Sequence, residues 1–281
     1  MKQVAIISGK GGTGKTTFSA LVHSIEGGVI ADCDVDAPNL HIILRPKILE
    51  KEEFFATEKA FITEKCISCG LCYELCRFNA ISFENGKYSV DESRCEGCAL
   101  CYNACPENAI EMKFVKTGEI YVSKTAYGSM VHARLEPGEE NSGRLVSEVR
   151  KKAEKIAKNS EYLIIDSPPG VGCPVIASLT GINFAIVISE PTLSGLSDLK
   201  RAVALTDHFS IKSCVVVNRY NLNTKIALEI REWCRENGIE FAGFVTFDEK
   251  LIEQMSSLNF PFYGEAAKSM SEIWNAVKEI F

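Results

Sequence analysis

The chain has 281 residues, of which 46% are hydrophobic and 24% are charged, and its formal net charge is −6. This length accommodates one large α/β domain and one small module, and the acidic balance disfavours a general nucleic-acid-binding protein, which needs a basic surface. No run of eighteen apolar residues is present and the first apolar run is too short for a signal peptide, so we expect a cytoplasmic protein without a transmembrane helix.

A phosphate-binding loop is predicted near the first residue. Residues 3–8 form a short apolar run typical of a strand, residues 9–15 are glycine-rich, and residues 16–23 begin a helical pattern. Residues 9–16 fit G-x-x-x-x-G-K-[ST] in the strand–loop–helix context that this motif requires. We expect Lys15 to reach the β- and γ-phosphates and the Thr16 hydroxyl to bind Mg²⁺. The predicted nucleotide-binding residues of this segment are Gly9, Gly11, Gly12, Thr13, Gly14, Lys15, Thr16 and Thr17.

Strands and helices alternate on both sides of a cysteine-rich region. Apolar runs typical of buried strands lie at 28–31, 162–165, 184–189 and 213–217, and helical patterns lie at 145–159, 225–237 and 266–280. This alternation predicts an α/β fold with a mostly parallel sheet and helices on both of its faces. Residues 118–143 are glycine-rich, and we expect them to be irregular. A structural role is expected for His132 in this segment, and a metal ligand or an electron-relay contact is the alternative.

The region from residue 60 to residue 115 is predicted to be an insertion. It lacks a long amphipathic helix and repeats internally, because each of its two cysteine runs is followed by Asn-Ala-Ile, at 79–81 and 108–110. We therefore expect a discontinuous P-loop domain at 1–59 and 116–281 around an inserted small α+β domain of the bacterial ferredoxin type at 60–115.

Both cysteine runs have the spacing of bacterial ferredoxins with two [4Fe–4S] clusters. Each run reads C-x2-C-x2-C-x3-C, and in this pattern the fourth cysteine of a run ligates the other cluster. Zinc is the main alternative, but paired C-x2-C zinc sites need no third and fourth cysteine at these intervals. The expected ligands are Cys66, Cys69, Cys72 and Cys105 for one cluster and Cys95, Cys98, Cys101 and Cys76 for the other.

The segment from Lys10 to Thr17 closely resembles the deviant Walker A motif of MinD, ParA and the nitrogenase iron protein. The resemblance covers nearly the whole chain and implies a homodimeric P-loop ATPase with ATP and Mg²⁺ bound at the interface between two copies. In that family the first lysine of the motif crosses the interface to the partner's nucleotide. The resemblance therefore implies a catalytic role for Lys10 beside Lys15.

Three further segments resemble the same family. Residues 32–36 are similar to its first switch, in which Asp34 matches the carboxylate that positions the attacking water, and Asp32 and Asp36 are weaker candidates for Mg²⁺-linked roles. Residues 164–170 resemble Walker B and the second switch, with Asp166 at the strand end. Asn218 matches the family's asparagine on the adenine side.

Four cysteines lie outside the two runs. We expect Cys33, Cys214 and Cys234 to be small buried residues. Cys173 lies seven residues after Asp166, at an offset similar to that of a cluster-binding cysteine in the nitrogenase iron protein. This resemblance suggests the hypothesis that Cys173 contacts a further metal cluster near the twofold axis of a dimer.

The leading functional hypothesis is an ATPase that couples ATP-dependent dimer closure to electron transfer to, or metal-cluster maturation of, an unknown partner protein. The alternative is an iron–sulfur scaffold or carrier ATPase, although the chain lacks the C-terminal C-x-x-C of Mrp-type carriers. A MinD- or ParA-type spatial regulator is less favoured, because residues 266–281 lack the basic face of a membrane-binding helix and the net charge is acidic. The expected partner is thus a redox or metallocluster-acceptor protein, and neither nucleic acid nor a membrane.

Overall fold

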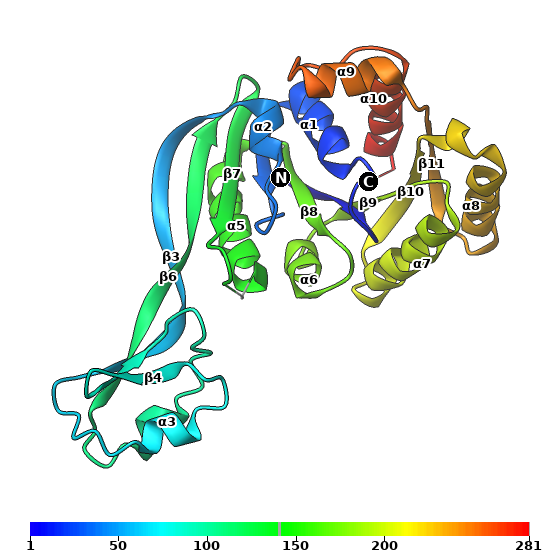
Figure 1. Ribbon diagram of the computed structural model, residues 1–281. Coiled ribbons are helices and arrows are strands. Elements are labelled where there is room, and N and C mark those ends of the chain that lie inside the picture. Colours follow the sequence, from blue (N-terminus) through cyan, green and yellow to red (C-terminus); the bar gives the residue numbers. More distant parts are fainter. Residues whose placement is uncertain (140–141, 281) are drawn as a thin grey trace. The chain divides into compact units, whose positions relative to one another are not determined.

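The computed structural model describes residues 1–139 and 142–280, which form two compact units (Figure 1). The large unit consists of Met1–Glu52, Ile120–Arg134 and the chain from Ser142 onward. The inserted unit consists of Glu53–Glu119 and the segment that begins at Leu135. Within the described residues, no helix is both long enough and apolar enough to cross a bilayer.

One large sheet organises the chain, and nine strands of the described residues form it in the order β11-β10-β9-β1-β8-β2-β7-β6-β3. These strands are β1 (Lys2–Ser8), β2 (Gly28–Asp32), β3 (Lys47–Ile62), β6 (Ile110–Lys124), β7 (Gly128–Leu135), β8 (Tyr162–Pro169), β9 (Phe184–Ser189), β10 (Lys212–Asn218) and β11 (Glu240–Val245). The pairings from β11 across to β7 are parallel. The predicted mostly parallel α/β fold is therefore confirmed.

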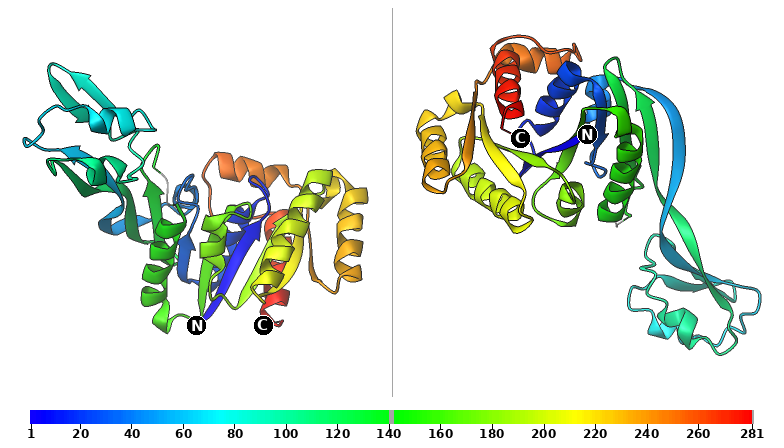
Figure 2. Two further views of the ribbon diagram at one scale, coloured as in Figure 1. Left: turned by 90° about the horizontal axis from the view of Figure 1, so that it is seen from below. Right: turned by 180° about the vertical axis from the view of Figure 1, so that it is seen from behind.

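Helices cover both faces of this sheet. They are α1 (Lys15–Glu26), α2 (Leu40–Leu44), α5 (Ser142–Ile156), α6 (Cys173–Leu179), α7 (Leu193–His208), α8 (Thr224–Glu236), α9 (Glu249–Ser256) and α10 (Glu265–Lys278), with short 3₁₀ turns at Ala157–Asn159 and Tyr220–Leu222. Figure 1 shows α1 and α10 on one side of the sheet and α5, α6 and α7 on the other. The first and last helices lie side by side, as the view from behind in Figure 2 shows.

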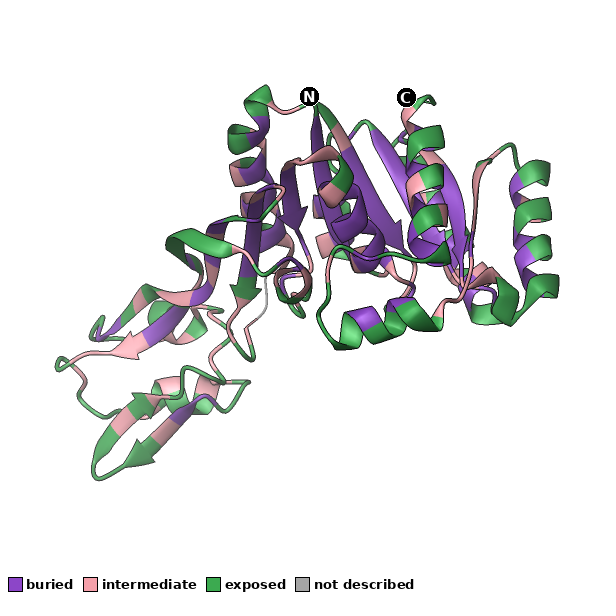
Figure 3. Ribbon diagram, turned by 90° about the horizontal axis from the view of Figure 1, so that it is seen from above, coloured by how far each residue is buried: buried purple, intermediate pink, exposed green. Residues whose placement is uncertain are grey.

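The central strands are the most deeply buried part of the chain (Figure 3). All six residues of β9 are buried, as are the first seven of the eight residues of β8. A parallel strand that is covered on both faces reads as a continuous apolar run rather than as an alternating pattern. This is why the sequence indicated these two strands clearly.

The prediction that residues 118–143 are irregular was wrong for most of that segment. Residues 118–124 belong to β6, and residues 128–135 form β7. The glycines misled the prediction, because Gly128 is required inside the sheet: a Cβ at this position would lie 2.1 Å from the carbonyl oxygen of Gly28. The part of the segment at 140–141 lies outside the described residues.

The inserted unit is built from short elements around the two cysteine runs. It contains α3 (Leu71–Leu75), α4 (Leu100–Ala104) and a hairpin of β4 (Ile81–Glu84) and β5 (Lys87–Val90). The hairpin turns at Asn85 and Gly86, which both have positive φ, of 51° and 80°. Asn-Gly is the preferred pair for such a two-residue turn. The strands β3 and β6 lead the chain into and out of this unit.

A buried arginine ties three elements of the large unit together, and its removal is expected to destabilise the fold. The Arg150 guanidinium on α5 donates to the carbonyl oxygens of Ala177 and Thr180, to the Gln3 side chain and to Glu154. Arg150→Met leaves these acceptors without their donor, and we expect it to lower the free energy of unfolding by about 3 kcal/mol. Urea denaturation followed by tryptophan fluorescence measures this change, because Trp274 is fully buried in the same unit.

Lys151→Met is the matched control on the neighbouring residue. Lys151 is exposed and forms an ion pair with Glu148 on the same helix, and an exposed pair of this kind contributes about 0.5 kcal/mol or less. Equal effects of the two substitutions would show that the Arg150 contacts do not hold α5 and α6 in place.

Candidate nucleotide and cluster sites

The glycine-rich loop follows β1 and ends where α1 begins at Lys15. Gly12 and Gly14 have φ of 77° and 97°, a region that L side chains rarely adopt. Space is also limited, because a Cβ on Gly14 would lie 2.3 Å from the amide nitrogen of Asn218, which itself donates to the Thr13 carbonyl oxygen at 2.8 Å. The loop therefore presents backbone N–H groups at the N-terminus of α1, an arrangement suited to phosphate groups.

Lys15 lies in a cluster of carboxylates at the ends of β2 and β8. These strands pair in parallel, so Asp32 lies opposite Asp166. Burial lowers the pKa of Lys15, while the charges of Asp166, Asp34 and Asp32 oppose this effect. Lys15 thus lies close to the loop that would receive an anion, with carboxylates that favour its charged form against the effect of burial.

Asp166 is fully buried at the end of β8 and accepts a hydrogen bond from the Ser19 hydroxyl at 2.9 Å. Burial raises the pKa of Asp166 to about 6, although Lys15 and the hydroxyls of Thr16 and Ser19 act in the opposite direction. A cation beside Asp166 would favour the ionised form. The Thr16 hydroxyl and the Asp166 carboxylate are thus oxygen ligands of the kind that Mg²⁺ prefers.

The three aspartates at 32, 34 and 36, at the end of β2 and just after it, have different environments. Asp32 is buried, and its two carboxylate oxygens accept from the backbone N–H groups of Asp34 and Leu40 at 3.1 and 3.3 Å. Asp34 is half-buried and faces the same hollow as the glycine-rich loop. Asp36 is exposed. Only Asp34 among the three is placed to meet a molecule bound at the loop.

Two neighbouring hollows adjoin the loop. The larger, of about 1210 Å³, is lined by loop residues together with Asp34, Asn39, Pro169 and Arg219. The smaller, of about 340 Å³, is lined by Asn218, the segment 246–248 and residues of α9. Gly14, Thr17, Arg219 and Met255 line both hollows. Phosphate groups bound at the loop would lie in the larger hollow and beside the smaller one.

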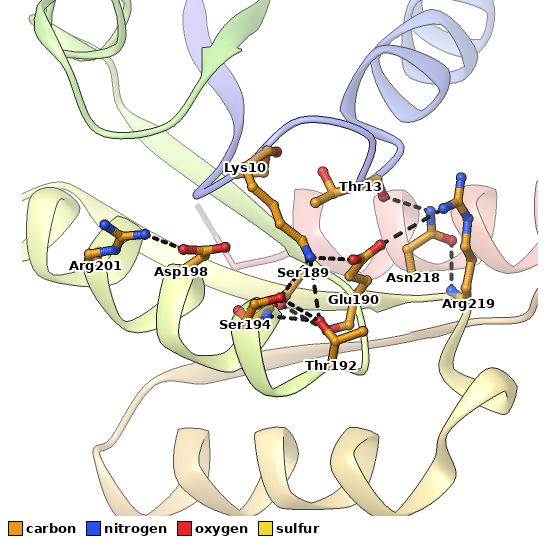
Figure 4. A network of polar contacts seen from close by, with 12 residues as sticks. Lys10, Thr13, Ser189, Glu190, Thr192, Ser194, Asp198, Arg201, Asn218 and Arg219 are labelled. Carbon is orange, nitrogen blue, oxygen red and sulfur yellow. Dashed lines mark hydrogen bonds and ion pairs between the residues drawn. The ribbon is translucent and has the colours of Figure 1, made fainter.

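The Lys10 side chain points toward Glu190, Thr192 and Ser194 (Figure 4). Its ammonium group lies 2.5 Å from a carboxylate oxygen of Glu190 and donates to the hydroxyls of Ser194 and Thr192 at 3.1 and 3.4 Å. The Arg219 guanidinium lies 3.9 Å from the other oxygen of Glu190. Within one chain, Lys10 is therefore held by the segment between β9 and α7.

The eight cysteines of the inserted unit line two separate hollows. The first cysteine hollow, of about 370 Å³, is lined by three cysteines of the first run and the last of the second, namely Cys66, Cys69, Cys72 and Cys105. The second cysteine hollow, of about 320 Å³, is lined by Cys76, Cys95, Cys98 and Cys101. The fold thus groups the thiols in the crossed manner that the spacing predicted.

Backbone N–H groups point at several of these sulfur atoms. Ser68 and Ala109 donate to the sulfurs of Cys66 and Cys105 at 3.4 and 3.3 Å, and Ala80 donates to Cys76 at 3.3 Å. Such bonds stabilise thiolates that bind iron. Over the described residues, no three His, Cys, Asp or Glu side chains converge closely enough to hold one metal ion. Four thiols line each hollow, and this number matches the ligands of one [4Fe–4S] group.

The four cysteines outside the two runs and His132 lie away from the two cysteine hollows. Cys33, Cys214 and Cys234 are buried, as expected. Cys173 is exposed at the first residue of α6, and its contact with a further cluster stays a prediction. His132 lies in β7 rather than in a loop, where its ring is bonded to the Ser123 hydroxyl at 3.0 Å, in keeping with a structural role.

The fold brings to these sites three residues that belong to none of the sequence motifs assigned a role above. Glu190 binds Lys10, Arg219 lines both nucleotide-side hollows, and Ser19 bonds Asp166. Ser19 lies one helical turn after Lys15, so its position on α1 was the one available signal. Glu190 is 180 residues from Lys10, and no local pattern connects them.

Comparison with known sequences supports the cluster site and identifies relatives of the chain. Residues 60–112 match the model of a 4Fe-4S dicluster domain. The chain is 38% identical over 225 residues to the uncharacterized protein MJ0578 of Methanocaldococcus jannaschii. The aligned region covers 79% of each of the two chains. It is 30% identical over 287 residues to MJ0579 of the same organism, covering 100% of this chain and 96% of that protein.

Solved structures show the same fold at low sequence identity. The septum site-determining protein MinD of Pyrococcus horikoshii, complexed with Mg-ADP, aligns with a TM-score of 0.61 at 15% identity over 99% of this chain and 96% of that one. The cell division ATPase MinD of Pyrococcus furiosus aligns with a TM-score of 0.59 at 16% identity, over 100% and 99% of the two chains. The chain therefore belongs to the family of MJ0578 and MJ0579, shares the fold of the MinD structures, and carries at residues 60–112 a segment that matches a 4Fe-4S dicluster domain.

Proposed function

We propose that two copies of this protein close around ATP and Mg²⁺, and that closure and hydrolysis control electron transfer from two [4Fe–4S] groups to a partner protein. The observation that carries this proposal is the presence, in one chain, of two complete four-cysteine hollows and a phosphate loop whose first lysine is paired with Glu190. The alternative effect of closure and hydrolysis is the maturation of a metal cluster in the partner protein.

Each residue of the nucleotide site has a proposed role. The loop from Gly9 to Thr17 binds the phosphates, with Lys15 on the β- and γ-phosphates and Thr16 on Mg²⁺. Asp166 holds a water of the cation, and Asp34 positions the water that attacks the γ-phosphate. Asn218 contacts the adenine in the smaller hollow, where it already fixes the loop through Thr13.

Lys10 is proposed to act on the nucleotide of the partner copy. Its ion pair with Glu190 keeps it outside its own phosphate site in a single chain. Closure of two copies would exchange this contact for one with the phosphates across the interface, which is a differential contact of the kind that lets a ligand shift a conformational equilibrium. ATP would then bind the closed dimer more tightly than the open one.

The cysteine hollows favour a protein that keeps its [4Fe–4S] groups over a carrier that delivers them to a partner protein. Each hollow offers four thiols from within one chain, so a [4Fe–4S] group would have a protein ligand on every iron. Bound in this way, the group supplies one-electron transfer at low potential. A carrier must release its cluster, which open coordination positions or shared ligands allow. The complete ligand sets therefore favour an electron donor over a scaffold or carrier.

A membrane-associated spatial regulator is disfavoured by the last helix. The apolar face of α10 is buried in the core of the large unit, and Trp274 donates to Glu26 at 2.7 Å. A helix whose apolar face already packs against the protein is not free to enter a bilayer. The proposed partner is thus a redox or metallocluster-acceptor protein.

Nucleotide-dependent dimerisation and turnover test the enzymatic part of this proposal. The iron-loaded protein, purified without oxygen, is expected to be monomeric with ADP and dimeric with a non-hydrolysable ATP analogue, and to release phosphate from ATP in the presence of Mg²⁺. Light scattering and phosphate release measure the two properties. A protein that stays monomeric with every nucleotide and releases no phosphate would contradict the proposal.

A further inference from the structure

We infer that Asp32 is a positioning residue for the loop that carries Asp34, and not a ligand of the nucleotide's cation. This inference deepens the proposed function, because it concerns the same hydrolytic site. It also separates the roles of Asp32 and Asp34, which the sequence alone places in one acidic group.

Asp32 directs both carboxylate oxygens into the backbone of the loop. One oxygen accepts from the N–H of Asp34 at 3.1 Å, and the other accepts from the N–H of Leu40 at 3.3 Å. These two donors lie at the start and the end of the segment 34–40, so one side chain fixes both ends of the loop. With its side chain fully buried and both oxygens engaged, Asp32 is not available to a solvated cation.

The end of the loop is anchored a second time. Leu40 is the first residue of α2 and is fully buried. The next residue, His41, stacks on His132 with ring centroids 5.9 Å apart and an interplanar angle of 8°. His132 lies opposite Asp32 in the pairing of β7 with β2. The loop therefore ends on a rigid support, and Asp34 is the half-buried carboxylate held between two fixed points.

Asp166 contrasts with Asp32 although the two lie in register on paired strands. The carboxylate of Asp166 bonds hydroxyl groups of α1, at Ser19 and Thr16, rather than backbone N–H groups. Burial raises the pKa of Asp32 well above its usual range, and the neighbouring charge of Asp166 adds to this effect. Two adjacent buried carboxylates thus serve different partners: Asp166 faces the phosphate-binding helix, and Asp32 faces the loop.

Three asparagine variants, of Asp32, Asp34 and Asp166, test this inference side by side. Asp32→Asn places an N–H₂ group beside an N–H donor, so we expect it to release the loop and lower kcat by about a hundredfold. The KM for ATP and the Mg²⁺ concentration at half-saturation are expected to stay close to those of the parent protein. Asp166→Asn is expected to raise the Mg²⁺ requirement, and Asp34→Asn to lower kcat without changing hydrogen exchange at Leu40.

Hydrogen exchange supplies a readout that is independent of turnover. In the ADP complex, Asp32→Asn is expected to speed exchange of the Asp34 and Leu40 amides by about tenfold, while Asp166→Asn leaves them protected. Unchanged protection in Asp32→Asn, or a rise in its Mg²⁺ requirement like that of Asp166→Asn, would overturn the inference. If the parent protein does not hydrolyse ATP, the proposed function fails, and the exchange data still decide the role of Asp32.

Discussion

Lys10→Ala is expected to lower the rate of ATP hydrolysis by about a thousandfold, the effect of removing a lysine or arginine that neutralises transition-state charge from across an interface. ATP binding to a single chain should change little, because Lys15, Thr16 and the loop backbone stay in place and Lys10 is directed toward Glu190. Single-turnover phosphate release measures the first effect, and titration with a fluorescent ATP analogue measures the second.

Glu190→Gln is the complementary variant. It weakens the contact that holds Lys10 within its own chain, so we expect dimerisation with an ATP analogue to become tighter by several-fold, in the range of an ion pair of about 1 kcal/mol.

The Lys10→Ala result would contradict the proposed interface role if hydrolysis stayed at the level of the parent protein. It would also do so if ATP affinity fell as much as the rate, since Lys10 would then act within one chain.

Paired cysteine substitutions are expected to distinguish crossed from uncrossed cluster ligands. The double variant Cys66→Ser, Cys105→Ser removes two thiols of one hollow and should retain about four of about eight iron atoms per chain. The double variant Cys95→Ser, Cys105→Ser removes one thiol from each hollow and should retain few or none. Iron and sulfide analysis of protein purified without oxygen measures both.

Cys234→Ala is the matched control, because Cys234 is buried in the large unit and lines neither hollow. It is expected to keep the full iron content. Uncrossed ligands would reverse the outcome of the two double variants, since Cys95 and Cys105 would then belong to one group. Equal loss in both would indicate that the inserted unit does not hold one group without the other.

Much of the fold follows from local sequence signals. The apolar run at 184–189 coincides with β9, and the helix after the glycine-rich loop begins at Lys15, within one residue of its predicted start. The signals were strong because parallel strands in the middle of the sheet are covered on both faces. The cysteine spacing was equally informative, since ligands to a small rigid group must recur at fixed intervals.

The strand β3, which lies at one edge of the sheet, could not be predicted in the same way. The first seven residues of β3, Lys47–Glu53, are exposed, and most of them are charged or polar. A strand with so little buried surface lacks the apolar pattern that marks a strand in the sequence. The glycines of 118–143 suggested turns, whereas Gly128 serves close packing of β7 on β2.

The parts of the site that escaped prediction are tertiary contacts. The pairing of Lys10 with Glu190 joins the first loop to the segment after β9, and its existence depends on the order of strands in the sheet. The different tasks of Asp32 and Asp166 depend on which donors the fold places around two similar carboxylates. Sequence motifs identified the carboxylates and the lysine of the site. The partners that distinguish their roles are known only from the structure.

The central claim is that nucleotide state and cluster state are coupled, and reduction potentials measured with and without nucleotide test it most directly. EPR-monitored redox titrations of the anaerobic protein, with no nucleotide, with ADP and with a non-hydrolysable ATP analogue, would be recorded together with the oligomeric state. We predict that the analogue produces dimers and shifts at least one potential by about 60 mV, equivalent to a tenfold difference in binding to the two redox states. Two stable clusters with identical potentials in all three states, whether or not dimers form, would contradict this account.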